Sequence, residues 1–211
     1  MILPDSRAAF IAVDIQNDFC PGGALAVPKG DAVVAVVNRV VRRFHKAAAT
    51  QDWHPPGHAS FASSRSGAIP YSTVEAEGIP QVLWPDHCVQ GTAGAAFHPG
   101  LDTGPYNLIL RKGFRPHLDS YSAFFENDRK TPTGLRGWLL DHGITEVWLA
   151  GLATDYCVLY SALDAVRLGF RAYVLTDAVR AVGVPEGSGR RALESMAGSG
   201  VILMESAGLE P

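Results

Sequence analysis

Residues 146–157, Glu-Val-Trp-Leu-Ala-Gly-Leu-Ala-Thr-Asp-Tyr-Cys, set the architecture that we expect for the rest of the chain. The run 146–150 is short, apolar and rich in strand-forming residue types. After the turn, apolar residues recur at helical spacing until a glycine ends the pattern: Val158, Leu159, Ala162, Leu163 and Val166, then Gly169. This pattern predicts a strand at 146–150 that leads through a tight turn into a helix at 155–168.

Cys157 lies in the first turn of that expected helix. The backbone N–H groups there lack intrahelical partners, and the helix dipole is positive at this end. Both effects favour a thiolate, so we expect the pKa of Cys157 to be lowered. The alternative is that Cys157 is buried and inert, as free cysteines often are.

The same alternation of strand and helix recurs along the chain. We expect strands at 8–15, 107–111, 146–150, 172–175 and 201–204, and helices at 31–49, 135–142, 155–168 and 186–197. The alternation predicts an α/β fold, a three-layer α/β/α arrangement around a mainly parallel, Rossmann-like sheet with right-handed crossovers. No linker divides the sequence, so residues 1–211 are expected to form a single domain. No phosphate-binding glycine pattern is present, because Gly187-Ser188-Gly189 follows no strand directly.

Composition restricts the possible partners. The 211 residues are 47% hydrophobic and 18% charged, with a formal net charge of −3. Without a basic block, we expect neither nucleic-acid binding nor a polybasic membrane contact. No apolar run approaches ~20 residues, and residues 1–7 do not resemble a signal peptide, so the expected location is the cytoplasm. Three cysteines favour a reducing compartment over a disulfide framework.

Residues from about 50 to 104 interrupt the alternation with many prolines, glycines and serines. A loop of this length in a compact domain is usually functional or disordered. It carries a carboxylate and three imidazoles that suit Zn²⁺, Fe²⁺, Mn²⁺ or Co²⁺: Asp52, His54, His58 and His87. Any one of these histidines is more often solvated or hydrogen-bonded to backbone, but together they predict a metal site. Cys88 is a less favoured ligand than His87, because adjacent side chains on an extended segment diverge.

The four other histidines, His45, His98, His117 and His142, have no such neighbours in the sequence, and we expect them on the surface.

Three further residues combine the groups that nucleophilic catalysis needs. Asp14, Lys112 and Cys157 each fall at the carboxyl end of an expected strand or in the turn after it. Open α/β sheets bind their ligands at this edge. A thiolate can attack, a carboxylate can carry protons, and a lysine can hold both. The alternatives are a structural ion pair between Asp14 and Lys112, or a solvated lysine.

Five blocks resemble the nicotinamidase family of the isochorismatase-like cysteine hydrolases. They are Asp14-Ile-Gln-Asn-Asp-Phe19, Asp52-Trp-His54, Trp84-Pro-Asp-His-Cys-Val-Gln-Gly-Thr92, Lys112-Gly113 and Gly151-Leu-Ala-Thr-Asp-Tyr-Cys-Val158. The blocks follow the order of the family over nearly the whole chain. The resemblance implies conversion of nicotinamide and water to nicotinate and ammonia through a thioester, in NAD salvage, with pyrazinamide as a further substrate. The state of assembly, monomer or homo-oligomer, stays open.

The resemblance also implies roles for individual residues. Asp14 would be the base, Lys112 the positioning cation and Cys157 the nucleophile. The backbone N–H groups of Ala153 and Cys157 would form the oxyanion hole, with a cis peptide before Ala153. The substrate would be bound by Phe19, Trp84, Tyr121 and Ala153, and one divalent ion (Zn²⁺, Fe²⁺ or Mn²⁺) by Asp52, His54, His58 and His87.

Two kinds of alternative remain. Within the same fold, the chain could be a carbamoylsarcosine or ureidoacrylate type of amidohydrolase, or belong to the isochorismatase branch, which lacks the cysteine. Cys157 disfavours that branch, and the expected metal ligands favour a nicotinamidase. From a different class, the chain could be a metal-binding protein or a thiol redox sensor. A sensor usually has a nearby resolving cysteine, and Cys20 and Cys88 form no Cys-x-x-Cys pair.

Overall fold

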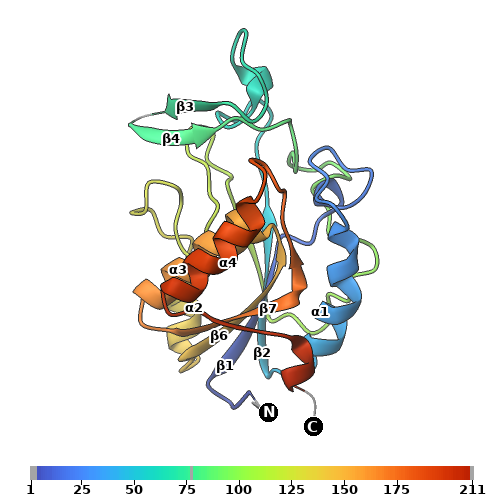
Figure 1. Ribbon diagram of the computed structural model, residues 1–211, viewed down its shortest axis with the longest axis vertical. Helices are drawn as coiled ribbons and strands as arrows, with labels where there is room; N and C mark the ends of the chain where they lie inside the picture. Colours follow the sequence, from blue (N-terminus) through green and yellow to red (C-terminus); the bar gives the residue numbers. More distant parts are fainter. Residues whose placement is uncertain (1–3, 77, 210–211) are drawn as a thin grey trace.

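A six-stranded parallel sheet forms the centre of the molecule in this computed structural model, which describes residues 4–76 and 78–209 (Figure 1). Residues 1–3 lie outside the described residues. They belong to the segment 1–7, which we expect not to be a signal peptide. The sheet contains β1 (Ala8–Val13), β2 (Lys46–Asp52), β5 (Leu108–Lys112), β6 (Glu146–Leu152), β7 (Arg171–Arg180) and β8 (Ile202–Met204). Their order is β5-β2-β1-β6-β7-β8. A separate antiparallel pair, β3 (Thr73–Ala76) and β4 (Ile79–Val82), lies beyond one end of the sheet (Figure 1).

Helices cover both faces of the sheet. The first helix, α1 (Val33–Val41), packs on one face. On the other lie α2 (Leu135–Asp141), α3 (Leu159–Arg167) and α4 (Ser188–Gly198), as Figure 1 shows. Alternate side chains of β1 serve the two cores: Ala8, Phe10 and Ala12 face α1, whereas Ala9, Ile11 and Val13 face the other helices. This double burial explains the uninterrupted apolar sequence of β1 and confirms the expected three-layer α/β fold.

The strand order reverses between β1 and β6, and this reversal places the functional segments. Val13 pairs with Gly151 at the carboxyl ends of these two strands. In the adjacent pair, Asp52 at the end of β2 is opposite Lys112 at the end of β5. Ligands of open α/β sheets bind at this kind of topological switch point. Asp14 and the turn that carries Cys157 therefore leave the sheet at the same edge as Asp52 and Lys112.

The helix expected at 31–49 is wrong in its second half. The helix ends at Val41, and residues 46–52 form β2. Alanine is a strong helix former, so Ala47-Ala48-Ala49 extended the helical pattern in the sequence. In the structure these residues are buried between β1 and β5. Tertiary packing therefore outweighs the local propensity of the alanines.

Three smaller differences concern the length, the type or the presence of an element. The strand expected at 172–175 extends over Arg171–Arg180. The helix expected at 155–168 starts as a π-helix over Thr154–Val158, before α3. The region from 50 to 104, expected to be mostly loop, contains the β3–β4 pair.

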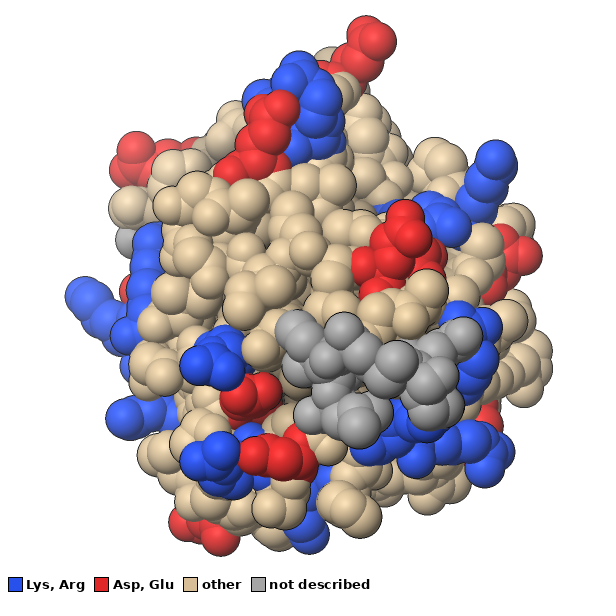
Figure 2. Space-filling view, turned by 60° about the horizontal axis from the view of Figure 1, so that its bottom comes forward, with Lys and Arg blue, Asp and Glu red and all other residues tan. Residues whose placement is uncertain are grey.

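The molecular surface seen from the lower side of Figure 1 carries acidic and basic side chains of both signs, interspersed with uncharged residues (Figure 2). Within residues 4–76 and 78–209, no helix is both long and apolar enough to cross a bilayer.

Candidate active site

Lys112 is the centre of a buried cluster of charged groups. Its ammonium group donates three hydrogen bonds: to Asp52 Oδ1 (2.5 Å), to the carbonyl of Ser120 (2.8 Å) and to Cys157 Sγ (3.4 Å). It also lies 2.9 Å from Asp14 Oδ2. Burial lowers the pKa of Lys112, but Asp14 and Asp52 outweigh burial and hold the pKa well above its ordinary value. The structure thus brings Asp14 and Cys157 to the same ammonium group, that of Lys112.

The two carboxylate oxygens of Asp14 have different surroundings. Thr50 Oγ1 donates to Asp14 Oδ1 at 2.6 Å and accepts from the Asp14 backbone N–H at 3.2 Å. Asp14 has a positive φ of 47°, rare for this residue type and frequent at functional sites. Oδ2 accepts no hydrogen bond from the described residues, and its close neighbour is the ammonium of Lys112, 2.9 Å away. Burial raises the pKa of Asp14, against the attraction of Lys112.

The environment of Cys157 corrects one sequence-based expectation. Burial raises the pKa of this thiol well above its ordinary value. Lys112 lowers the pKa, whereas Asp14 and Asp52 raise it further. The expected lowering of the pKa is therefore wrong, because two carboxylates and a nearly complete loss of solvent outweigh the helix terminus. The raised pKa favours the neutral thiol, which needs a base before it can attack, and Sγ lies within 4.8 Å of a carboxylate oxygen of Asp14.

The turn that carries Cys157 is fixed at both ends. The peptide bond between Leu152 and Ala153 is cis, as the resemblance implied. The Val158 N–H donates to the carbonyl of Ala153 at 3.1 Å, which closes the first π-helical turn. Asp155 then accepts hydrogen bonds from the backbone N–H groups of Val182 and Gly183, both at 2.9 Å. This carboxylate ties the start of the helix to the segment after β7.

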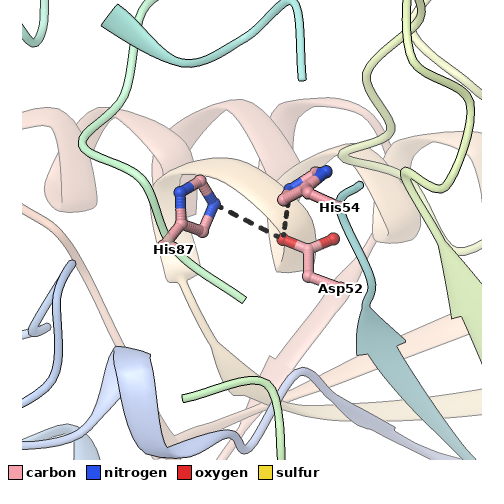
Figure 3. A group of neighbouring side chains, drawn as sticks. All are labelled: Asp52, His54 and His87. Carbon is pink, nitrogen blue, oxygen red and sulfur yellow. Dashed lines mark ion pairs between the residues drawn. The ribbon is translucent and has the colours of Figure 1, made fainter. Parts of the chain in front are cut away.

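Two of the expected metal-binding histidines are directed at Asp52 (Figure 3). His54 Nε2 lies 3.6 Å and His87 Nε2 lies 3.9 Å from Asp52 Oδ2. The Nδ1 atom of His54 bonds the carbonyl of Gly113 and that of His87 bonds the carbonyl of Pro85, both at 2.8 Å. Carbonyl partners of this kind orient imidazoles for metal binding through Nε2. One ligand atom from each of Asp52, His54 and His87 lies within 4.8 Å of the others.

Gly113 explains the second half of the Lys112-Gly113 block. Its φ of +65° is in the left-handed region that favours glycine. A Cβ atom at this position would lie 2.5 Å from Cε1 of His54. The glycine therefore allows the backbone to approach the imidazole and bond its Nδ1 atom.

His58 lies beside this group but does not join it. Its Nδ1 atom bonds Ser60 Oγ at 2.7 Å, and its Nε2 atom bonds the carbonyl of Arg115 at 2.9 Å. Its ring lies 4.4 Å from the ring of His54, centroid to centroid. The structure thus brings three of the four expected ligands together and leaves both nitrogens of the fourth bonded to protein atoms.

The other metal-ligand alternatives lie apart. Cys88 is buried and belongs to no described group of three candidate ligands, and its N–H donates to Asp18 Oδ2 at 2.7 Å. His45, His117 and His142 are exposed as expected, and His98 is half-buried.

A narrow cavity opens onto the thiol. All four residues expected to bind the substrate line it: Phe19, Trp84, Tyr121 and Ala153. Its lining also includes the expected metal-site residues Asp52 and His87, and Cys157 itself. Trp84 Nε1 donates to the Tyr121 hydroxyl at 3.2 Å, which fixes two of the aromatic walls relative to each other. The cavity therefore combines aromatic walls with a sulfur atom and with two residues of the candidate metal-binding group.

The isochorismatase domain family matches residues 8–208, almost the entire chain. The chain belongs to the isochorismatase family. Among curated members, it is 47% identical to the nicotinamidase of Acinetobacter baylyi over 95% of this chain and 94% of that protein. It is also 47% identical to the nicotinamidase of Escherichia coli, over 92% of this chain and 93% of that one.

Solved structures in the isochorismatase family agree with this placement. A nicotinamidase/pyrazinamidase of Acinetobacter baumanii superposes with a TM-score of 0.95 at 45% identity, covering 98% of this chain and 99% of that one. A protein of L. infantum in complex with nicotinate matches with a TM-score of 0.85 at 37% identity, covering 98% and 96%. A pyrazinamidase of Pyrococcus horikoshii in complex with zinc matches with a TM-score of 0.77 at 37% identity, covering 94% and 99%.

Sequence reasoning missed two residues of this isochorismatase-family site, Gln16 and Asp119. Gln16 donates to the carbonyl of Asp52 and accepts from its N–H, both at 2.8 Å, so it clamps the backbone of that residue. Asp119 lines the cavity and lies within 4.8 Å of His54 and His58. Gln16 stands in the Asp14–Phe19 block, which was a usable signal. Asp119 lies in the loop after β5, where no helical or strand periodicity in the sequence marks it.

Proposed function

We propose that the chain is a metal-dependent nicotinamidase that hydrolyses nicotinamide to nicotinate and ammonia through a thioester on Cys157. Pyrazinamide, with its similar ring and carboxamide, would be a second substrate. The curated nicotinamidases that share 47% identity with most of the chain support the activity. One structural observation carries the mechanism: Lys112 lies 2.9 Å from Asp14 and 3.4 Å from Cys157, and Cys157 lines a cavity with aromatic walls.

The first half of the reaction would acylate Cys157. Asp14 takes the thiol proton through its available Oδ2 atom as the sulfur attacks the amide carbon. The raised pKa of the thiol makes such a base necessary. Asp14 then gives the proton to the departing nitrogen, so ammonia leaves and a thioester remains. Lys112 stays charged throughout and stabilises the anionic forms of both partners.

The second half would release nicotinate. Asp14 takes a proton from water, the hydroxide attacks the thioester carbon, and the proton returns to the sulfur as the C–S bond breaks. In both halves the carbonyl oxygen becomes negative and needs hydrogen-bond donors. The backbone N–H groups of Ala153 and Cys157 are our candidates. Cys157 lies in the first helical turn, where N–H groups lack intrahelical partners.

The donor set fits a divalent ion. Asp52, His54 and His87 offer one carboxylate and two imidazoles in a buried group, a mixture that suits Zn²⁺, Fe²⁺ or Mn²⁺. Burial, together with His54, lowers the pKa of His87 to about 4, so this imidazole is in the neutral form that binds metals. When bound, the ion would supply a Lewis acid for the ring nitrogen and so orient the substrate. We place His58 against His54, as a support for its ring.

Phe19 and Trp84 would enclose the ring of the substrate, and both are buried. The slot is walled by rings and lies beside the ligand group on one side and the thiol on the other. An aromatic amide with a ring nitrogen would use both ends of it. The aliphatic amides of the carbamoylsarcosine and ureidoacrylate alternatives offer no ring to these walls.

An ammonia assay tests the proposal. Purified protein is supplied with nicotinamide, with pyrazinamide and with an aliphatic carboxamide, before and after dialysis against a chelator. We expect ammonia from the two aromatic amides, loss of release after dialysis, and recovery with Zn²⁺, Mn²⁺ or Fe²⁺. A redox sensor or a metal-storage protein would release no ammonia under any of these conditions.

A further inference from the structure

A second cavity is lined by Tyr121 but not by Cys157. It measures about 310 Å³ and is lined by β4 residues Ile79 and Pro80, by six residues between 121 and 129, and by Tyr160 and Asp164 of α3. In the described parts of the chain, the two cavities share only Tyr121. The catalytic mechanism leaves this second cavity without a role.

Glu126 gives the second cavity an unusual interior. The residue is only 2% exposed, yet its Oε2 atom has no hydrogen-bond partner among residues 4–76 and 78–209. Its other oxygen, Oε1, lies 4.0 Å from Arg115 Nε, at the limit of an ion pair. Buried carboxylates are normally paired, because removing an unpaired charge from water is costly. Glu126 is one of the residues that line the cavity, so a hydrogen-bond donor bound there would be the natural partner for this oxygen.

Burial raises the pKa of Glu126 to about 7, against the opposing effects of Arg115 and the Ser120 hydroxyl. The carboxyl can therefore ionise near neutral pH, and a cation beside it would favour the ionised form.

The rest of the lining suits an apolar ring that carries positive charge. The rings of Tyr121 and Tyr160 lie 5.2 Å apart, and aromatic faces attract cations. Asp164 adds a second buried carboxylate, although its neighbour Arg167 lies 3.4 Å away. The cation of the lining, Arg129, is exposed, and its guanidinium lies 5.9 Å from the ring of Tyr160. Among the described residues, the lining therefore contains two buried acids and one basic residue, which is exposed. Its two tyrosine rings are buried or half-buried.

We propose that this second cavity binds a small organic cation, an ammonium or amidinium carried on one apolar ring, with its N–H groups bonded to Glu126 Oε2. The ring lies against Tyr121, Phe125 and Tyr160. This ligand is chemically distinct from the neutral carboxamide of the proposed reaction, so the cavity would be a separate binding site.

Benzylammonium is a suitable probe, and benzyl alcohol and benzoate are its neutral and anionic counterparts. Calorimetric titration of the intact protein at about pH 8 is expected to detect benzylammonium only. Glu126→Gln keeps the shape of the side chain and removes its charge, and we expect at least ~10-fold weaker binding. Ile79→Trp fills the cavity while Glu126 itself stays unchanged, and it should also abolish binding.

Two variants serve as controls. Phe19→Ala alters only the catalytic cavity, and Glu75→Gln removes an exposed carboxylate on β3. Both are expected to bind benzylammonium as the wild type does. Binding that survives Glu126→Gln and Ile79→Trp but is lost in Phe19→Ala would place the cation in the catalytic cavity and overturn the proposal. Equal affinity of the wild type for benzyl alcohol and benzylammonium would also overturn the proposal, and so would the absence of benzylammonium binding to the wild type. Ammonia release from nicotinamide is measured separately, so failure of this proposal leaves the proposed function intact.

Discussion

Asp14 and Glu126 are both buried acids, but the fold compensates their charges very differently. Asp14 lies at the carboxyl edge of the sheet, where it has a hydrogen bond from Thr50 and the ammonium of Lys112 2.9 Å away. Glu126 lies in the connection between β5 and α2, where Arg115 is 4.0 Å away and one oxygen has no hydrogen-bond partner among the described residues. Both acids have a raised pKa through burial.

The difference follows from where each acid stands in the topology. Parallel strands end together, so β1, β2 and β5 deliver an acid, a second acid and a lysine to one edge in a fixed register. The cost of burying each charge is then offset by a neighbour that the sheet itself positions. The loop that carries Glu126 has no such register. One carboxylate oxygen of Glu126 therefore has no hydrogen-bond partner among the described residues. We therefore assign chemistry to the first acid and ligand binding to the second.

The largest expected effect is that of Cys157→Ala, which removes the proposed nucleophile at the sheet edge. Ammonia release from nicotinamide should fall by ~10⁴-fold or more, because no acyl-enzyme can form. Metal content, measured by elemental analysis, should not change, since the cysteine lies outside the group of Asp52, His54 and His87. Cys20→Ala is the matched control and should retain activity. Turnover by Cys157→Ala near that of the control would refute the role of the thiol.

Matched amide substitutions compare the two acids directly. Asp14→Asn keeps the hydrogen bond with Thr50 but removes the base, so kcat should fall by ~10²–10⁴-fold. Glu126→Gln should leave kcat and KM for nicotinamide within about threefold, because Glu126 lines only the second cavity. Steady-state ammonia release measures both. Similar losses in the two variants would mean that Glu126 takes part in the reaction, and the contrast between the two regions would fail.

The sheet edge was also the part that the sequence predicted best. Strand ends are readable from apolar runs, so Asp14, Lys112 and Cys157 could be placed on one edge before any coordinates. The strand that carries Asp52 could not be predicted, because its alanines look helical until β1 and β5 enclose them. Glu126 was invisible for a different reason. Its burial depends on long-range packing of a loop against β4 and α3, which leaves no periodic signal.

A smaller effect is expected within the metal group, where histidines with different surroundings can be compared. His54→Ala removes a nitrogen directed at Asp52 and should lower the bound metal at least ~10-fold, with weaker substrate binding. His58→Ala should retain most of the metal, because both nitrogens of His58 already bond protein atoms. Elemental analysis after dialysis distinguishes the two variants. Equal metal loss in both would make His58 a fourth ligand, as the sequence resemblance implied.

The smallest expected effect concerns stability and the pH. The pKa of Glu126 is raised from an ordinary 4.5 to about 7, so the folded state binds its proton more tightly than the unfolded state. Wild-type stability should therefore fall as the pH rises through this interval. Glu126→Gln cannot ionise, so its Tm should exceed that of the wild type by about 2–6 °C at pH 8, a gain of about 1–2 kcal/mol after allowance for solvent screening.

That Tm difference should shrink towards pH 5, where Glu126 is protonated in the wild type too. Thermal unfolding at both pH values gives the comparison, with Glu75→Gln as the exposed control whose Tm follows the wild type. A difference that is the same at pH 5 and pH 8 would show that the amide alters packing instead of relieving a charge. A wild type that is the more stable protein at pH 8 would mean that Arg115 fully compensates Glu126. In that case the two acids would be alike, and the cavity would have no uncompensated carboxylate to offer a cation.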